Sequence, residues 1–228
     1  MGINDLDYLT VALPKGKLFS PSADLLAQAG LLADGLEESS RKLVLVNEQA
    51  KVKFIISKTA DVPTYVEYGA ADIGVIGKDV LEESGQEVYE LLDLGFGHCH
   101  LMMAVPDGER RPHLEDYAHT RVATKFPRIA ERFFSEHGMQ MEYIKLNGSI
   151  ELGPIVGLSE SIVDIVETGT TLRENHLVEN QRLALVEGTT DVVKIGKYQE
   201  LLPQDMNKGA GVRALRTLPV YEGKYLFN

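Results

Sequence analysis

The stretch 161–172 carries the residues whose types and order are best suited to chemistry. Its β-rich run 162–166 contains Asp164, Glu167 follows, and Thr168-Gly169-Thr170-Thr171 opens an expected helix. A strand, a hydroxyl-rich glycine turn and a helix N-terminus offer backbone N–H groups and a positive dipole end to an anion. The two acids could bind sugar hydroxyls or Mg²⁺. This order of residues predicts a site for an activated sugar phosphate.

The same turn has a simpler interpretation, in which Thr168 to Thr171 only cap a helix and bind nothing. Asp164 weighs against it, because an acid within an apolar strand is costly unless it lies near the strand's carboxyl end over a site. The sequence therefore favours the binding interpretation and leaves the other open.

A second candidate is the loop Leu13-Pro14-Lys15-Gly16-Lys17, which follows an expected strand at 8–13. Open α/β sheets place ligand loops at this position, and two lysines around a glycine let ammonium and backbone groups approach a polyphosphate. The spacing is not that of a Walker loop. The alternative is a basic turn in solvent.

Two further residues, Arg41 and Asp72, have side chains of a kind that could bind a ligand. Arg41, before an expected strand at 42–46, could bind phosphate bidentately, or could be a surface charge. Asp72 precedes a buried-looking strand, and Gly69 and Gly74 around it would let backbone approach a ligand. Both residues are therefore candidates for contact with a ligand.

The elements that position these residues alternate between strand and helix. We expect strands at 8–13, 42–46, 52–57, 71–76, 88–93 and 99–105, and helices from Ser20 to about Gly30, from Asp61 to Gly69 and from Asp79 to Gly85. The polar segment 106–119 is predicted to cross between two lobes. A second βα series follows, with strands at 121–124, 140–145 and 161–166, a helix from Pro127 to Gly138 and a helix or turn at 149–157. This alternation predicts an α/β fold with a largely parallel sheet.

Composition excludes several functions. The net charge of −11 opposes non-specific nucleic-acid binding, and no apolar run is long enough to cross a membrane. The N-terminus lacks the basic and apolar regions of a signal peptide, and Cys99 is the single cysteine, so we expect a cytoplasmic protein. His98 and His100 share a strand face, but no third metal ligand is evident.

The block 151–172 resembles the signature of the ATP phosphoribosyltransferase family, which catalyses the first step of histidine biosynthesis. The resemblance extends over roughly 8–177. Outside the signature it rests on the Leu-Pro-Lys-Gly-Lys loop and on the segments 40–43, 61–67, 69–74, 77–81 and 89–94. Within the signature, the matching positions are Glu151, Gly157, Ser159, Ile162, Asp164, Ile165, Thr168, Gly169, Thr171 and Leu172.

The resemblance implies an α/β fold of two lobes with a cleft, similar to type II periplasmic binding proteins. Lobe 1 would comprise 1–104 and about 182–228, and lobe 2 would comprise 105–181 and carry the phosphoribosyl pyrophosphate loop. The segment 182–186 would be the strand that returns the chain to lobe 1. The tail 188–228 departs from the family pattern.

The resemblance also implies a reaction and its residues. The 5-phosphoribosyl group of phosphoribosyl pyrophosphate would pass to N1 of ATP with Mg²⁺ present. Lys17 and Arg41 would bind the departing pyrophosphate, with Lys15 and Gly16 beside them. Asp164 and Glu167 would face the ribose, and Thr168, Gly169, Thr170 and Thr171 would bind the 5′-phosphate. Asp72 is a further substrate-binding candidate, and no residue is assigned as a metal ligand.

The length of 228 residues resembles the short form of the family. That form implies a homodimer and a hetero-oligomer with a regulatory subunit resembling histidyl-tRNA synthetase, with no nucleic acid and no membrane as partners. Three alternatives stay open at this point. They are a phosphoribosyltransferase with another base as acceptor, a two-lobed ligand-binding protein without turnover, and a catalytic chain inactive without its regulatory partner.

Overall fold

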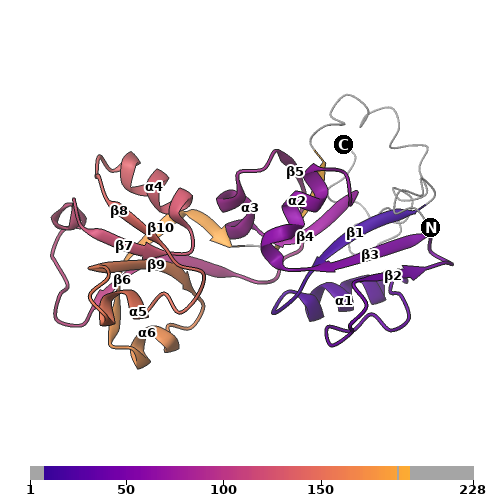
Figure 1. The fold of residues 1–228 in the computed structure, drawn as a ribbon, viewed down its shortest axis with the longest axis horizontal. Helices are drawn as coiled ribbons and strands as arrows, with labels where there is room; N and C mark the ends of the chain where they lie inside the picture. Colours follow the sequence, from indigo (N-terminus) through magenta and orange to yellow (C-terminus); the bar gives the residue numbers. More distant parts are fainter. Residues whose placement is uncertain (1–7, 189, 196–228) are drawn as a thin grey trace. The chain divides into compact units, whose positions relative to one another are not determined.

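A computed structural model describes residues 8–188 and 190–195, which form two compact units. The described part of the first unit comprises 8–77, 84–97 and 190–195, and the second comprises 78–83 and 98–188. Each unit is built on its own sheet (Figure 1). No helix among the described residues is long and apolar enough to cross a membrane.

The sheet of the first unit has the order β2-β3-β1-β4-β11-β5. The strand β1 runs parallel to both β3 and β4, whereas β2 is antiparallel to β3, and β11 is antiparallel to β4 and β5. The strand bounds are β1 Leu9–Pro14, β2 Val44–Asn47, β3 Val52–Ser57, β4 Ile73–Gly77, β5 Val88–Asp93 and β11 Thr190–Ile195.

Two helices pack on this sheet. Helix α1 (Phe19–Gln28) buries Phe19 against a core that includes Val11, Leu13 and Phe54. Helix α2 (Val62–Glu67), after the short 3₁₀ helix η1 (Thr59–Asp61), packs directly on the backbone of β4. A Cβ atom at Gly74 would lie 2.6 Å from Val62 Cγ1, so this close approach requires glycine.

The sheet of the second unit has the order β10-β6-β9-β7-β8. The strand β7 runs parallel to β8 and β9, and β6 is antiparallel to β9 and β10. The strand bounds are β6 Cys99–Pro106, β7 Arg121–Thr124, β8 Glu142–Lys145, β9 Ser161–Val166 and β10 Leu177–Gly188. The helices are α3 Lys78–Ser84, η2 Leu114–Tyr117, α4 Pro127–Glu136, α5 Leu152–Ile155 and α6 Thr170–Glu174.

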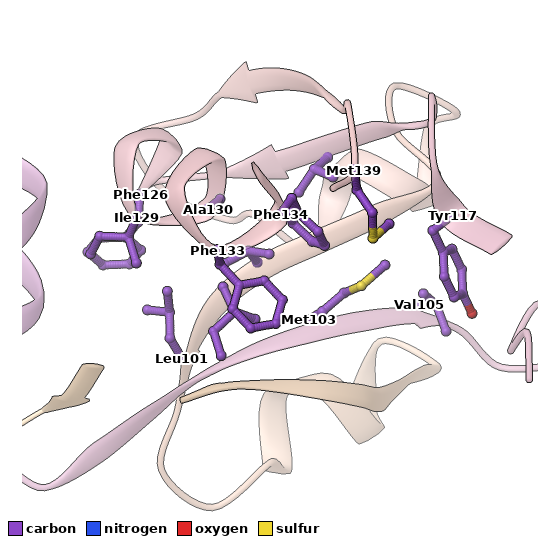
Figure 2. Packing of buried hydrophobic residues seen from close by; sticks show 13 residues of the cluster. Leu101, Met103, Val105, Tyr117, Phe126, Ile129, Ala130, Phe133, Phe134 and Met139 are labelled. Atoms are coloured by element: carbon purple, nitrogen blue, oxygen red, sulfur yellow. The ribbon is translucent and has the colours of Figure 1, made fainter. Parts of the chain in front are cut away.

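The core of this unit forms under α4. Phe133 and Phe134 of the helix face Leu101 and Met103 of β6, and Tyr117 lies at the far end of the same cluster (Figure 2). Helix α4 has no side-chain cap of its own, but the carboxylate of Glu83 accepts hydrogen bonds from the N–H groups of Arg128 and Ile129 at 3.0 and 3.2 Å. These two bonds hold α3 against the N-terminus of α4. Burial of the Glu83 carboxylate raises its pKa.

At the opposite end of this sheet, Glu160 joins β7 to the start of β9. Its carboxylate accepts hydrogen bonds from the guanidinium of Arg121 and from the Arg121 N–H at 2.8 Å. The Arg121 guanidinium lowers the pKa of Glu160 to about 2. The pair is part-exposed, so we expect it to fix strand position more than to add stability.

Most expected elements are present with shifts of one or two residues. Helix α1 begins at Phe19, with Leu18 rather than Ser20 at the cap position, and β2 starts at Val44 rather than at 42. The first sheet is also mixed rather than largely parallel, because β2 and β11 run antiparallel to their neighbours. Of these two strands, β2 lies at an edge of the sheet and β11 lies between β4 and β5. The direction of such long-range pairing cannot be read from local hydrophobic periodicity.

The segment 106–119 does not cross between the units. It is a loop of the second unit, held by the bond from Asp107 N to His176 O at 2.9 Å and by the bond from Arg111 N to the Tyr117 hydroxyl at 2.6 Å. The chain enters the second unit at 77/78, returns to the first at 83/84 and enters the second again at 97/98, just before β6, which pairs with β9 and β10.

The segment 182–186 does not return the chain to the first unit either. Arg182 lies opposite Met102 in the pairing of β10 with β6, within the second sheet. The return is made by β11, which pairs with β4 and β5. The unit boundaries therefore differ from the expected 104/105 and 181/182, and most of the tail 188–228 lies outside the described residues.

Candidate active site

The loop of Lys15, Gly16 and Lys17 follows the carboxyl end of β1 and leads into α1. Its backbone is fixed on both sides, because Lys15 N donates to Ser57 O at 2.8 Å and Thr59 Oγ1 donates to Lys15 O at 3.2 Å. Gly16 has φ +91°, and its Cβ position is open. Both lysines are exposed, so a turn whose backbone is held by these bonds places two cations at the surface of the first unit.

The structure brings the segment 37–42 to this loop. The Glu38 carboxylate accepts a hydrogen bond from the Gly16 N–H at 2.7 Å. Arg41 lies three residues further on, is exposed, and makes no hydrogen bond or ion pair within the described residues. The segment that carries Arg41 is therefore bonded to the lysine loop through Glu38, and a shared role of Arg41 and Lys17 stays a prediction.

Asp72 lies at the other end of the sheet. Its carboxylate accepts a hydrogen bond from Thr10 N at 2.7 Å, and its own N–H donates to Thr10 O at 2.8 Å. These contacts are made at the amino ends of β1 and β4, whereas Lys15 follows the carboxyl end of β1. The structure therefore does not bring Asp72 together with Lys15, Gly16 and Lys17.

The turn after β9 has the geometry that the sequence predicts. Strand β9 ends at Val166 and α6 begins at Thr170, with Gly169 in the left-handed region at φ +68°. The hydroxyls of Thr168 and Thr170 lie 3.1 Å apart, and the Arg173 guanidinium donates to Thr170 Oγ1 at 3.2 Å. Within the described residues, the backbone N–H groups of 168–171 donate to no protein acceptor, so the turn keeps them available to an anion.

Gly169 should be required by its backbone conformation. A Cβ atom there would lie 3.0 Å from Arg173 Nη1 and from Glu179 Oε1, which are movable side-chain ends, so the main cost is the left-handed backbone. We expect Gly169→Ala to lower the free energy of unfolding by about 1–2 kcal/mol. Gly148→Ala is the control, since Gly148 has no positive φ and open space around it. Equal melting temperatures for both variants would contradict the expectation.

Asp164 lies on the strand that leads into this turn and has a shifted pKa. Burial raises its pKa to about 6; Glu151 and Asp79 act in the same direction, whereas the Ile165 N–H and Lys125 oppose them. Asp164 Oδ1 accepts from Ile165 N at 2.8 Å. A half-buried carboxylate with a shifted pKa beside an anion-binding turn is typical of a functional site.

Lys125 and Asp79 were missed by sequence reasoning. Lys125 follows the carboxyl end of β7, a position where α/β sheets place ligand residues, and this was the available signal. Asp79 was read only as a helix start. It is 8% exposed, and burial raises its pKa while Lys125 lowers it. Its proximity to Asp164 depends on α3 packing in the second unit, which no local pattern reveals.

The histidines at 98 and 100 form no metal site among the residues that the structure describes. No group of three or more His, Cys, Asp or Glu side chains there could hold a metal ion. His100 Nδ1 instead lies 2.7 Å from Arg182 Nη2 on the neighbouring strand β10. This contact is a strand-to-strand interaction of the second sheet.

The fold and the two loops define an α/β protein of two units, in which each unit has a loop of the kind predicted to bind an anion. The substrate-binding protein of an amino acid ABC transporter has the same fold at 11% identity, with a TM-score of 0.55 over 95% of this chain and 100% of that chain. The ATP phosphoribosyl transferase (HisG:HisZ) complex from Thermotoga maritima is more similar, at 31% identity and a TM-score of 0.74. It is matched over 92% of this chain and 95% of that chain.

The family model described as ATP phosphoribosyltransferase matches residues 58–200. An ATP phosphoribosyltransferase of Desulfitobacterium hafniense is 52% identical over 194 residues, 82% of this chain and 86% of that protein. One of Syntrophotalea carbinolica is 53% identical over 175 residues, 76% of this chain and 80% of that protein. The chain belongs to the ATP phosphoribosyltransferase family.

Family membership confirms the resemblance seen in 151–172 and the expected two-lobed α/β fold class. It also confirms the expected class of activity, the pentosyl transfer of histidine biosynthesis, over the two alternatives of another acceptor base and of binding without turnover. The comparisons assign no residue to a role, so the site residues remain predictions.

Proposed function

We propose that this chain transfers the 5-phosphoribosyl group of phosphoribosyl pyrophosphate to N1 of ATP and releases pyrophosphate. The observation that carries the proposal is the turn 168–171, where four consecutive backbone N–H groups without protein acceptors follow a strand that holds Asp164. This arrangement suits a phosphorylated ribose, because the N–H groups bind the phosphate while the acid faces the sugar.

The residue roles follow from charge and position. The Thr168 to Thr171 turn would bind the 5′-phosphate, and Asp164 and Glu167 would face the ribose hydroxyls. Lys17 and Arg41, with Lys15 and Gly16, would bind the pyrophosphate. The contacts of Asp72 with Thr10 give it a role within the sheet, so we assign it no direct contact with substrate.

In the reaction, adenine N1 attacks the anomeric carbon as the bond from this carbon to the pyrophosphate oxygen breaks. The N1 lone pair forms the new bond, and the breaking bond's electron pair leaves with pyrophosphate. N1 carries no proton to remove, so the step needs no strong general base. The protein's contribution is alignment and charge stabilisation. Lys17 and Arg41 would stabilise the leaving group, and ionised Asp164 would stabilise the positive charge that develops on the ribose.

Mg²⁺ fits this site as an ion that arrives with substrate. The described residues contain no group of three or more His, Cys, Asp or Glu that could hold a metal, and Mg²⁺ is commonly bound largely by substrate phosphates and water. When bound, it would neutralise part of the pyrophosphate charge. As in the sequence prediction, we assign no residue as a resident metal ligand.

The partners are proposed from the relatives. The Thermotoga maritima protein was solved as a HisG:HisZ complex, which supports a hetero-oligomer of this chain with a regulatory subunit of that kind, resembling histidyl-tRNA synthetase. A homodimer of catalytic chains and a cytoplasmic location stay predictions. The mass of the purified chain in solution would test the homodimer.

The experiment that tests the function is pyrophosphate release by the purified chain, with ATP, phosphoribosyl pyrophosphate and Mg²⁺ present. Pyrophosphatase is added as the coupling enzyme, because it removes a product that could hold the equilibrium back by mass action. We expect release that requires both substrates and that falls to background when adenine, guanine or uracil replaces ATP. No release, even with a regulatory subunit of a relative added, would contradict the proposal.

A further inference from the structure

The hydrogen bond between Glu38 and Gly16 joins the two segments that carry Lys17 and Arg41. The Gly16 N–H donates to Glu38 Oε1 at 2.7 Å, the short distance expected when the acceptor is charged. Lys17 is the next residue after Gly16, and Arg41 is three residues after Glu38. One bond between exposed groups therefore links the two cations that the proposed function assigns to the pyrophosphate.

The segment around Arg41 has few other restraints. Leu36 before it is buried, and β2 begins after it at Val44. Its other hydrogen bonds are internal: Ser40 N donates to Glu37 O, Lys42 N to Ser40 Oγ, and Ser39 Oγ to Glu37. Within the described residues, Glu38 is thus the side chain that joins 37–42 to the lysine loop.

The bond is poorly suited to a role in global stability. Both partners are exposed, and ordering a glutamate side chain in solvent costs conformational entropy that offsets much of the gain from the bond. The Glu38–Gly16 bond should affect the reaction rate more than it affects stability. A small displacement of a side chain that binds the leaving pyrophosphate lowers the rate strongly. The bond therefore matters most for the relative placement of the two cations.

We propose that Glu38 is a positioning residue for phosphoribosyl transfer. Its bond to Gly16 holds the segment of Arg41 against the lysine loop, so that Arg41 and Lys17 reach the same pyrophosphate. This inference rests on the proposed function. The opposite role is also testable: a carboxylate on the Gly16 N–H could compete with pyrophosphate for the same donor.

Glu38→Ala and Glu38→Gln separate these roles. Glutamine keeps an oxygen acceptor and loses the charge, whereas alanine loses both. We expect Glu38→Ala to lower kcat/KM for phosphoribosyl pyrophosphate about 10-fold and Glu38→Gln to stay within about 3-fold of the parent. Glu37→Ala is the matched control, because Glu37 is a neighbouring exposed acid whose side chain, among the described residues, is hydrogen-bonded to Ser39 and not to the lysine loop. All three variants should keep the parent melting temperature.

A double-mutant cycle with Arg41 tests the mechanism. If Glu38 acts by placing Arg41, Glu38→Ala should change kcat/KM by less than about 2-fold in an Arg41→Ala background. Pyrophosphate binding by titration calorimetry gives a second readout, and Glu38→Ala should weaken it. Tighter pyrophosphate binding in both Glu38 variants would establish the competing role and overturn the positioning role.

Failure of the inference is distinguishable from failure of the proposed function. If Arg41→Ala lowers turnover while Glu38→Ala matches Glu37→Ala, the proposed roles stand and Glu38 positions nothing. Additive effects of Glu38→Ala and Arg41→Ala would also overturn the inference. If Lys17→Ala and Arg41→Ala both leave turnover and pyrophosphate binding unchanged, the assignment of the pyrophosphate site itself is wrong.

Discussion

Arg41→Ala should lower kcat at least about 100-fold while leaving the melting temperature unchanged. Arg41 is exposed and makes no hydrogen bond or ion pair with another described residue, so we expect its removal to leave the packing of the first unit intact. A preorganised donor that stabilises charge in a transition state contributes about 2.7–4 kcal/mol, or roughly 100- to 1000-fold in rate. Single-turnover kinetics with saturating substrates would measure this loss on the chemical step itself.

Two further variants make the measurement specific. Arg41→Lys keeps the charge but loses the bidentate geometry, so we expect an intermediate rate. Lys42→Ala removes the adjacent exposed cation and should leave the rate within about 3-fold of the parent, because the effect depends on position rather than on total charge. Equal single-turnover rates for Arg41→Ala and the parent would remove Arg41 from the mechanism.

The loops could be predicted from the sequence because their signals are local. In 161–171 the apolar run, the acid, the glycine and the hydroxyls each specify one step of a strand–turn–helix, and the structure shows that order. The lysine loop likewise follows from a strand end and a glycine at positive φ. Local signals of this kind do not depend on which elements pack against each other.

The parts that were wrong depend on long-range pairing. The sequence of β10 does not specify which strand it pairs with, and its register with β6 places it in the second unit. The helix α3 lies between β4 and β5 in the chain, yet Glu82 and Glu83 join it to α4 by bonds to Arg132, Arg128 and Ile129. Asp79 is near Asp164 for this reason. Tertiary contacts between such distant segments are not encoded in hydrophobic periodicity.

Asp164→Asn should lower activity and raise stability at the same time. The neutral amide cannot stabilise positive charge on the ribose, so we expect kcat/KM to fall about 100-fold. The pKa of Asp164 is raised from 3.8 to about 6, which means that folding holds the ionised carboxylate at a cost. If the whole pKa shift acts on stability, the ionised carboxylate lowers the free energy of unfolding by about 3 kcal/mol. We therefore expect the free energy of unfolding of Asp164→Asn at pH 7.5 to exceed that of the parent by about 1–3 kcal/mol.

The pH dependence of this gain identifies its cause. A raised pKa means that the native state binds the proton more tightly than the unfolded state. The stability of the parent protein therefore falls as the pH rises from 3.8 to about 6, and it falls no further above that pH on account of Asp164. The stability difference between Asp164→Asn and the parent should therefore shrink to about a third at pH 4.5. The groups that face Asp164 are Glu151, Asp79 and Lys125, and the variant leaves all three in place.

Asp107→Asn is the control for this comparison, because Asp107 is an exposed acid of the same unit outside the turn. The free energy of unfolding is measured by urea titration at pH 7.5 and 4.5 for the parent, Asp164→Asn and Asp107→Asn, and kcat/KM is measured for each at pH 7.5. A loss of stability in Asp164→Asn at pH 7.5 would mean that the carboxylate serves packing rather than substrate. Lost activity with gained stability is the pattern expected of a group whose burial is maintained for chemistry.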